Sequence, residues 1–396
     1  MAEQLKAAFG KVKMTPEEHA PLQGYDAAAN IADPAKDVLD DIYARILLLD
    51  DGRARKVIIG IDSCVTSEVP FLPVRPSDNG GKYNYFANTF AEGTRREWGE
   101  AAEGEESSVT VIATHTHSAP AYFSRKYTSR VTAAIRDLMQ ELQPVRLKAA
   151  SGECTVSVNR RPRLQHNDSI PIDRSLQVLV FETTEGHPIG ALVNCAVHPT
   201  LLMNTIGRVS GEFVGLAMNE LEERYGDGFV SLFIQGFSGD VGPVGHYRTE
   251  TEDTYPLVRE MGHRLCGDIE RTAARLSAID GLPLRSEEKT IRLPAKEGYY
   301  MPYVPMSIHG LRIGEAVLLS TSGEIFNSFT GPLRSGSPFP HTLLAGLANG
   351  YSGYLPTVAA FRDGLGGYEI KTTPYSEEAC PIFAEETADL IRNLHA

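Results

Sequence analysis

The segment VTVIATHTHSAP, Val109–Pro120, joins an apolar strand pattern to two closely spaced histidines. Its first four residues are apolar or β-branched, which predicts a buried strand. His115 and His117 follow, and Pro120 ends the pattern. Side chains two residues apart on an extended chain point to the same face, so we expect both imidazoles to point the same way at the carboxyl end of a strand. Neutral imidazole suits zinc; the alternative is a hydrogen-bonded pair in a loop.

Strand and helix patterns alternate on both sides of this segment and predict an α/β fold. Short Asp/Gly or Glu/Gly turns predict three hairpins: Tyr43–Leu49 with Lys56–Asp62, Val178–Glu182 with Ile189–Val197, and Ile308–Arg312 with Ala316–Ser320. A buried strand is expected over Phe229–Ile234, and helices over Thr128–Leu142, from a cap at Ser210, over Thr254–Leu276 and over Pro381–Leu394. We expect one large domain, residues 1–396, around a mixed β-sheet, with the metal site at strand ends. Gly331–Pro340 is expected to be a long surface loop.

The composition is that of a soluble globular protein and argues against several kinds of partner. Hydrophobic residues make up 42% and charged residues 22% of the chain, which is ordinary for such proteins. The net charge of −13, without a long basic cluster, argues against nucleic acid and anionic membrane surfaces as partners. We therefore expect a small-molecule substrate, and the sequence leaves a homo-oligomer open.

The cysteines and the first residues favour the cytoplasm. The chain has five scattered cysteines and no C-x-x-C, which predicts buried thiols in a reducing compartment. The first residues, MAEQLKAAFGKVKM, lack the apolar core of a signal peptide, and no apolar run approaches the length of a membrane span. The five are Cys64, Cys154, Cys195, Cys266 and Cys380.

Four further stretches carry side chains that could complete a site. In NCAVHPT, His198 follows an apolar run and precedes a proline, as the first histidine of THTH follows its own strand. In QGFSGDVGP, Asp240 is the one charge, and the Gly-Lys-Ser/Thr of a phosphate-binding loop is missing. Glu324 in STSGEIF follows a strand, and Tyr351 and Tyr354 lie in the Gly-rich GLANGYSGYLPT.

Each of these signals also has an ordinary structural explanation. A lone histidine after a strand is often packed or capped, and a Gly-rich turn often needs its glycines for positive φ. A glutamate in a first helical turn complements the helix dipole, and tyrosines in such loops often pack or cover a site. The order of the motifs along the chain is more specific than any one of them.

That order resembles the neutral (non-lysosomal) ceramidase family of zinc-dependent amidohydrolases. The similar features are THTHS-x-P, VHPT, GDV-x-P, GE and GLANGYSGY, each after a predicted strand. Thr15-Pro16, the stretch YARILLLDDG and Asn159-Arg160 are also similar. The resemblance spans roughly Val12 to Glu369 and most of the tail, and it implies the fold and metal site of that family.

Residue by residue, the resemblance implies a zinc site with four ligands: His115, His198, Glu324 and Tyr354. His117 matches the histidine beside the metal that positions or protonates the reacting group. Arg160 matches the arginine that contacts the substrate, and Asp240 completes the predicted catalytic set. Whether His115 or His117 is the direct ligand stays open.

Zinc chemistry agrees with this set of residues. Two neutral imidazoles and a carboxylate leave Zn²⁺ partly charged, so that a bound water has a pKa of about 7. An amine leaves poorly as an anion and needs a nearby acid, for which His117 is placed. The planar guanidinium of Arg160 could hold a substrate oxygen or carboxylate.

Three departures from the family pattern argue against ceramide as the substrate. The family has a serine in G-D-V-S-P where this chain has Gly242, so the hydroxyl is absent or replaced by a group such as Ser238 or His246. The chain stops near Ala396, where the family continues into an immunoglobulin-like domain, and it shows no secretion signal.

The sequence therefore predicts a cytoplasmic zinc-dependent hydrolase that cleaves a C–N amide bond of a small polar substrate by metal-activated water. One alternative keeps the metal but changes the bond to an ester, a lactone or a glycoside-like linkage, because a zinc-bound hydroxide does not select the leaving group. The other is a metal-binding or sugar-binding protein without turnover, which the missing serine hydroxyl at Gly242 motivates.

Overall fold

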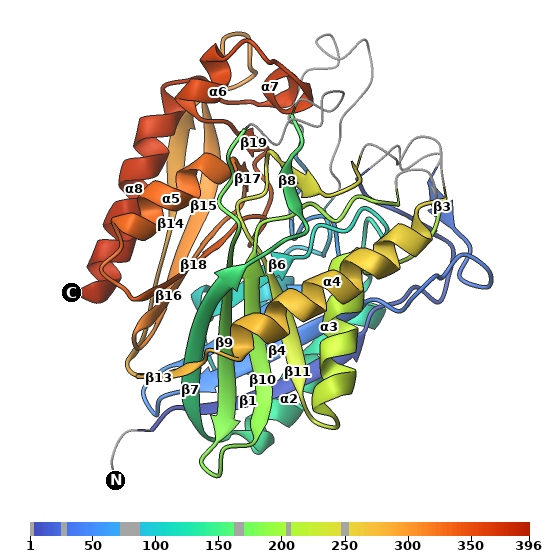
Figure 1. Cartoon of the computed structure of the whole chain (residues 1–396), viewed down its shortest axis with the longest axis vertical. Helices are drawn as coiled ribbons and strands as arrows, with labels where there is room; N and C mark the ends of the chain where they lie inside the picture. The colour runs from blue at the N-terminus through green and yellow to red at the C-terminus, as the bar shows by residue number, and fades with distance from the viewer. Residues whose placement is uncertain (1–3, 25–29, 72–87, 162–169, 203–206, 247–252) are drawn as a thin grey trace.

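Two β-sheets share one buried core, and helices cover their outer faces (Figure 1). The structure is a computed structural model and describes residues 4–24, 30–71, 88–161, 170–202, 207–246 and 253–396. Strands and helices alternate along the chain, and both sheets contain parallel and antiparallel pairs. The predicted mixed α/β fold is confirmed.

The larger sheet has nine strands, in the order β11-β10-β9-β7-β1-β4-β5-β6, with β13 paired to β7. Two neighbouring pairs, β5/β6 and β10/β11, are parallel. The hairpins β4/β5 and β9/β10 are the predicted ones. The bounds are β1 Lys6–Lys13, β4 Tyr43–Asp50, β5 Arg55–Ile61, β6 Val109–Ala113, β7 Gln143–Glu153, β9 Ser175–Thr183, β10 Pro188–Cys195, β11 Val230–Gln235 and β13 Ser277–Ile279.

The smaller sheet has four strands, in the order β14-β15-β16-β18, with β16 and β18 parallel. Its strands are β14 Leu284–Pro294, β15 Tyr303–Ile313, β16 Ala316–Thr321 and β18 His341–Ala345. Three short strand pairs complete the sheets: β2 Ala20–Pro21 with β3 Ile31–Ala32, β8 Ser157–Asn159 with β12 Val241–Pro243, and β17 Glu324–Ile325 with β19 Tyr354–Leu355.

The longer helices lie on the outer faces of the two sheets, and two short helices lie at one end of the molecule near β19 (Figure 1). Their bounds are α1 Thr94–Ala101, α2 Arg125–Glu141, α3 Glu212–Tyr225, α4 Tyr255–Ala273, α5 Thr330–Ser335, α6 Val358–Arg362, α7 Tyr368–Thr372 and α8 Ala379–His395, with 3₁₀ turns at Glu106–Ser108 and Asn327–Phe329. Ser210 accepts a hydrogen bond from the backbone N–H of Glu212 at 2.9 Å, but the N-cap of α3 is Gly211, so the predicted cap lies one residue too early. The predicted loop Gly331–Pro340 contains most of α5, whose Leu333 is buried. In the described part of the chain, no helix is long and apolar enough to cross a membrane.

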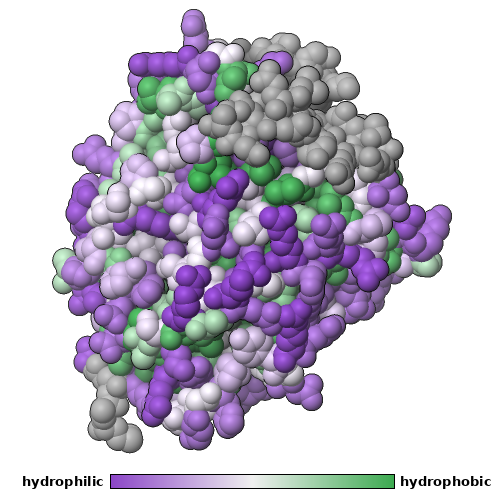
Figure 2. All heavy atoms as spheres, in the orientation of Figure 1, coloured by the Kyte–Doolittle hydropathy of each residue, from purple (hydrophilic) through white to green (hydrophobic). Residues whose placement is uncertain are grey.

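The alternation of side chains along β4 explains the layers. Ile46 and Leu48 pack in a buried cluster with α2, whereas Leu47 and Leu49 pack in a second cluster with strands of the smaller sheet. Because neighbouring side chains point to opposite faces, the continuous apolar run in this strand is buried on both sides. The smaller sheet is covered on its other face by α8, and α3 and α4 cover another part of the larger sheet. Figure 2 shows hydrophilic residues across the middle of the face where Figure 1 shows α4.

Candidate metal centre

Three parallel strand pairs place the predicted site residues at one point. His115 follows the carboxyl end of β6, His198 follows β10, and Glu324 follows β16. Parallel strands end at the same edge of a sheet, where α/β proteins bind ligands. In Figure 1 the short strands β8, β17 and β19 lie together above these ends. The expected position of the site at strand ends agrees with this arrangement.

Three side-chain atoms from distant parts of the chain lie in mutual contact. Nε2 of His115 is 3.1 Å from Nε2 of His198 and 3.3 Å from Oε2 of Glu324, and Nε2 of His198 is 3.0 Å from the same carboxylate oxygen. All three residues are at most 3% exposed. Ligand atoms about 2.0–2.1 Å from a tetrahedral zinc ion are themselves about 3.3 Å apart. The group therefore has the ligand types and spacing of a metal site.

The hydrogen bonds of the two rings leave both Nε2 atoms as acceptors. Nδ1 of His115 lies 2.6 Å from the carbonyl oxygen of Cys64, and Nδ1 of His198 lies 2.7 Å from that of Ser238. A carbonyl oxygen only accepts, so each Nδ1 carries a proton, and each ring in its neutral form has its lone pair on Nε2. This arrangement, with a backbone carbonyl behind each imidazole, is typical of metal-ligating histidines.

One proton cannot satisfy the three contacts. A proton on Nε2 of His115 could be donated to His198 or Glu324, but the contact of 3.0 Å between His198 and Glu324 would still join two acceptors. A cation accepts all three lone pairs at once. The donor set of two imidazoles and one carboxylate therefore fits a divalent metal ion such as zinc.

The pKa values show that this group attracts positive charge. Burial opposes the charged form of His115, but the Glu324 carboxylate outweighs it and raises the pKa of His115 to about 10. Burial also opposes ionisation of Glu324, and the neighbouring His115 outweighs it and holds the pKa of that carboxyl well below its ordinary value. Burial, together with the charges of Arg160 and His115, lowers the pKa of His198 to about 3. Glu324 is thus an ionised carboxylate, as a metal ligand must be.

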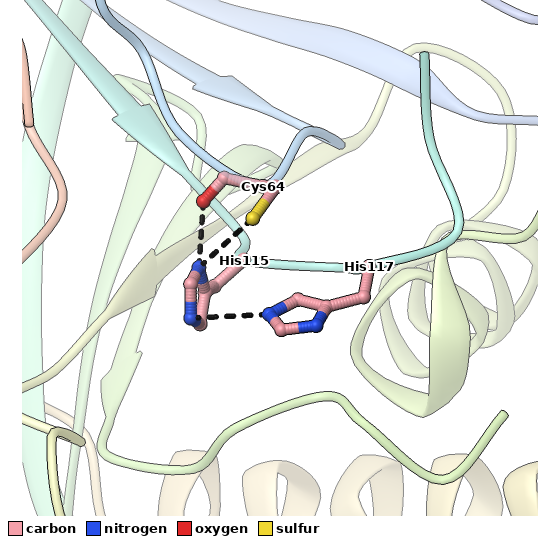
Figure 3. A group of neighbouring side chains, drawn as sticks. All are labelled: Cys64, His115 and His117. Atoms are coloured by element: carbon pink, nitrogen blue, oxygen red, sulfur yellow. Dashed lines mark hydrogen bonds between the residues drawn. The ribbon is translucent and has the colours of Figure 1, made fainter. Parts of the chain in front are cut away.

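His117 lies beside this group and is half-buried (Figure 3). Its Nε2 is 3.4 Å from Nε2 of His115, while the other ring nitrogen of His115 points to Cys64. A Cβ at Gly24 would come within 2.3 Å of the His117 ring, so only glycine fits there. The geometry favours His115 as the ligand and His117 as its neighbour, an assignment that stays a prediction.

The backbone between the two histidines is not extended, contrary to our expectation. β6 ends at Ala113, and His115 has a φ of 73°, in the left-handed region that non-glycine residues rarely adopt. Two hydrogen bonds hold this conformation, from the N–H of Thr114 to the carbonyl of Ile61 and from that of His115 to the carbonyl of Ser63. Strained backbone of this kind concentrates at functional sites. The two imidazoles therefore come together because the backbone turns at His115. The alternation of side chains along an extended strand, which we expected, is not the cause.

The two tyrosines of the Gly-rich stretch differ in their contacts. The hydroxyl of Tyr351 donates to Oε1 of Glu324 at 2.6 Å, which leaves Oε2 for the histidines. Tyr354 is the backbone register partner of Glu324 between β19 and β17, and its hydroxyl accepts from Nη2 of Arg160 at 3.1 Å. The predicted ligand Tyr354 therefore lies on the strand that pairs with the strand of Glu324. Tyr351, for which we predicted no role, holds the Glu324 carboxylate.

The two remaining predicted residues form the wall beside Tyr354. Arg160 also donates from Nη2 to the carbonyl of Gly239 at 3.1 Å and forms an ion pair of 3.0 Å with Glu369 through Nε. The Asp240 carboxylate accepts from the side chain of Asn159 at 3.1 Å and from the backbone N–H of Asn327 at 2.8 Å. These contacts join β8, β12 and the start of a 3₁₀ turn. The catalytic role of Asp240 stays a prediction.

Sequence reasoning missed the residues that bring the strand ends together. The Gln235 side chain donates to the carbonyls of Thr114 at 2.9 Å and Val197 at 2.7 Å, and so ties the two histidine segments together. A Cβ at Gly239 would lie 2.5 Å from the carbonyl oxygen of Glu324. Gly236 and Gly239 of QGFSGDVGP allow close approach of backbones. The alternative that we considered for these glycines, a positive φ, is not seen at either. A glutamine at a strand end and closely spaced glycines are the only sequence signals for this packing.

Ser238 and His246, the predicted replacements for the family hydroxyl that Gly242 lacks, stay predictions. Ser238 contributes its backbone carbonyl to His198, and Nδ1 of His246 lies 3.1 Å from the carbonyl of Pro243. A Cβ at Gly242 would lie 3.1 Å from Cβ and 3.4 Å from Cδ of Arg160. The Arg160 side chain thus packs directly over Gly242.

Comparison with known proteins supports the resemblance stated from the motifs. No family model matches the chain. Neutral ceramidases B and A of Dictyostelium discoideum are each 29% identical to it over 171 residues, which are 35% and 34% of this chain and 24% of each relative. The neutral ceramidase of Pseudomonas aeruginosa is 30% identical over 193 residues, 40% of this chain and 28% of that relative. The matched segments thus span about a quarter of the length of the curated relatives.

The fold agrees over the whole chain. The crystal structure of neutral ceramidase from Pseudomonas aeruginosa has a TM-score of 0.78 at 19% identity and covers 100% of this chain and 75% of its own. A structure described as a ceramidase complexed with C2 has a TM-score of 0.77 at 19% identity, over 99% of this chain and 75% of that one. The chain is thus similar in sequence to neutral ceramidases over about a third of its length, and its fold is similar to theirs throughout.

Proposed function

We propose that the protein is a zinc-dependent hydrolase that cleaves the C–N amide bond of a small polar substrate. The observation that carries this proposal is the mutual contact of three acceptor atoms, from His115, His198 and Glu324, in a buried site. The names of the curated relatives support amide-bond hydrolysis, because a ceramidase acts on ceramide, a fatty-acid amide.

His115, His198 and Glu324 would hold the ion, with Tyr354 as the proposed fourth ligand. A bound zinc ion supplies Lewis acidity, which polarises a carbonyl group and makes water nucleophilic near neutral pH. The carbonyls of Cys64 and Ser238 fix the tautomer and the direction of the two imidazoles, and the Tyr351 hydroxyl fixes the carboxylate. These contacts would hold the ligands in place before a substrate binds.

His117 is the proposed proton carrier of the reaction. Its Nε2 lies 3.4 Å from the group without being one of the three mutually contacting atoms. An imidazole that is neutral near pH 7 can take the proton that the attacking water loses and then donate it to the departing amine. Close packing against Gly24 holds the ring in position for both transfers.

The wall formed by Arg160 is the proposed place for the rest of the substrate. Nη2 and Nε of Arg160 are engaged by Gly239, Tyr354 and Glu369, and the side chain keeps 17% of its surface exposed. Gly242 carries no hydroxyl, and Arg160 packs over it. Polar recognition by a guanidinium favours a small polar substrate over a two-chain lipid.

The test combines metal analysis with turnover. Elemental analysis of protein purified without added metal should show about one zinc-type ion per chain, and His198→Ala should lose most of it. His263→Ala is the matched control, because His263 is exposed on α4 and pairs with Glu220. Chelation should abolish hydrolysis of N-acyl amides in a panel that also contains esters and lactones, and added zinc should restore it. Folded, metal-free protein with full activity would falsify the proposal, and metal binding without any turnover would favour the binding protein.

We further propose that the protein works in a reducing cytoplasm. All five cysteines are free thiols and buried in the structure, as predicted. Cys64 lies closest to the centre, with Sγ 3.8 Å from Nδ1 of His115. Thiol titration of protein purified without reductant should give five free groups after unfolding; a disulfide found there would contradict this location.

A further inference from the structure

Arg160, the residue that we expect to contact the substrate, is already paired with a carboxylate. Its Nε lies 3.0 Å from Oε1 of Glu369, a residue of α7. Glu369 is 6% exposed, so the pair is shielded from water on the glutamate side. Sequence reasoning gave Glu369 no role, since it is separated from Arg160 by more than two hundred residues.

The remaining contacts of Arg160 place Nη2 against Tyr354, the register partner of Glu324. Nη2 donates to the Tyr354 hydroxyl and to the carbonyl of Gly239, each at 3.1 Å. Among the described residues, the hydrogen bonds and ion pairs of this side chain involve Nη2 and Nε, and Nη1 makes none of them. Nη1 is therefore the part of the fork left for a ligand.

The neighbouring arginine anchors the segment that carries Glu369. Arg161 forms a bidentate pair with Asp363, with N–O distances of 2.6 and 3.0 Å, and donates to the carbonyl of Gly366 at 3.3 Å. The ring of Tyr368 meets the ring of Tyr354 edge-on with centroids 5.9 Å apart. Because α7 is held at several points, Glu369 is part of a fixed wall.

The pairing changes the charge that a substrate meets. An isolated guanidinium binds carboxylates well, because its planar fork matches them. Here the charge of Arg160 is balanced by Glu369, and a second carboxylate at Nη1 would lie close enough to Glu369 to be repelled in a poorly hydrated site. Hydroxyl and carboxamide oxygens can still accept from Nη1 without that repulsion.

We propose that Glu369 determines the charge of the substrate: by pairing with Arg160 it rejects substrates that carry a carboxylate beside the scissile amide and selects neutral polar ones. This inference rests on the proposed hydrolase function and adds the substrate class. Glu369 acts through Arg160 and is therefore a positioning residue for specificity.

The test uses probes that differ in charge alone. N-hexanoylglycine and N-hexanoylglycinamide differ on the amine side of the amide, and N-butylsuccinamate and N-butylsuccinamide differ on the acyl side. We expect the wild-type protein to prefer the neutral member of at least one pair by about tenfold or more in kcat/KM, as repulsion of one like charge implies. Glu369→Gln should shrink or reverse that ratio, mainly through KM of the charged probe.

Two control variants separate charge from structure. Glu369→Asp keeps the charge and should keep the neutral preference, even if packing suffers. Glu377→Gln removes an exposed carboxylate that pairs with Arg362 and should leave the ratio unchanged. An unchanged ratio in Glu369→Gln, or a wild-type protein that accepts both members equally at both ends, overturns the inference. If Glu369→Gln does not fold, the wild-type ratio alone decides.

Binding measurements test the inference about Glu369 separately from the proposed hydrolase function. If the wild-type protein hydrolyses none of the four probes, the hydrolase proposal fails on these substrates. Calorimetric dissociation constants of the same probes with zinc-loaded protein then decide the inference. Weaker binding of the charged members, relieved in Glu369→Gln, supports it, and equal binding overturns it.

Discussion

The hydroxyl of Tyr351 donates to Oε1 of Glu324 at 2.6 Å, while Oε2 of the same carboxylate contacts His198 at 3.0 Å and His115 at 3.3 Å. The tyrosine thus decides which carboxylate oxygen is presented to the histidines. Both residues are buried, so water cannot easily replace a lost hydrogen bond. Ligand orientation by such outer partners usually contributes to metal affinity.

Tyr351→Phe should therefore weaken metal binding without unfolding the protein. Removing a partner of a ligand typically costs about 10–100-fold in metal affinity. The measurement is the zinc dissociation constant, obtained by competition with a chromophoric chelator. Tyr127→Phe is the matched control, because the Tyr127 hydroxyl accepts from the backbone N–H of Glu17 far from the centre. Equal affinities in the two variants would show that Tyr351 does not orient Glu324.

His117→Ala should retain the metal and lose turnover. If His117 carries the proton and His115 is the ligand, kcat should fall by about 10²–10⁴-fold while zinc content stays near that of the wild type. Gly24→Ala is a companion, because the added Cβ would meet the His117 ring at 2.3 Å and push it away. Elemental analysis and steady-state kinetics on the same samples are the measurements. Loss of metal in His117→Ala would mean that the two histidines have the opposite roles.

Glu212 should make the protein less stable as the pH rises. It is 1% exposed, and burial raises its pKa to about 8 from an ordinary 4.5, although Oε1 accepts from the N–H of Leu202. Between these two values the folded state holds a proton that the unfolded state has lost, so the free energy of unfolding falls with pH, by up to about 1.4 kcal/mol per pH unit. Asp40, whose pKa burial raises to about 6, adds an effect of the same sign.

Urea unfolding between pH 5 and pH 8 measures this slope. Glu212→Gln removes the titrating group, so its free energy of unfolding should fall less steeply over the same range. Glu223→Gln, on the exposed side of α3, is the control and should keep the wild-type slope. Parallel curves for the wild-type protein and Glu212→Gln would contradict the prediction.

The candidate metal centre could be predicted from the sequence because its residues follow the ends of apolar strands. His115, His198 and Glu324 each follow a short, strongly apolar strand, and hydrophobic patterns identify such strands well. Their order along the chain then supplied the resemblance that sequence and fold similarity support. The three predicted hairpins are present for the same reason, because apolar runs separated by turn residues are local signals.

The missed features depend on contacts between distant segments. The left-handed turn at His115 is fixed by the carbonyls of Ile61 and Ser63, which no local pattern reveals. Gln235, Tyr351 and Glu369 act on partners that lie 27 to 209 positions away. Nothing in their own sequence neighbourhood distinguishes them from ordinary polar residues. Such roles follow from the packing of strand ends, which becomes visible only in the folded chain.

The last prediction concerns the substrate that the relatives are named for. We expect the wild-type protein to hydrolyse long-chain ceramide in detergent at a negligible rate compared with its best soluble substrate. The net charge of −13 opposes binding to anionic lipid surfaces. Gly242 also offers no hydroxyl where the side chain of Arg160 packs, at 3.1 Å from a Cβ placed there. Ceramide cleavage at rates comparable with the best soluble substrate would overturn this expectation.

Comparison of Gly242→Ser with Gly242→Ala distinguishes the effect of a hydroxyl from the effect of the added side-chain volume. Both variants add a Cβ, and in both the Arg160 stem must move by a few tenths of an ångström. Only serine can donate a hydrogen bond to a polar substrate atom. A donor that stabilises developing charge contributes about 1.4 kcal/mol or more. We therefore expect ceramide turnover to be at least about tenfold higher in Gly242→Ser than in Gly242→Ala. Equal rates in the two variants would show that the missing hydroxyl is not the barrier, and that the wall formed by Arg160 and Glu369 decides the substrate instead.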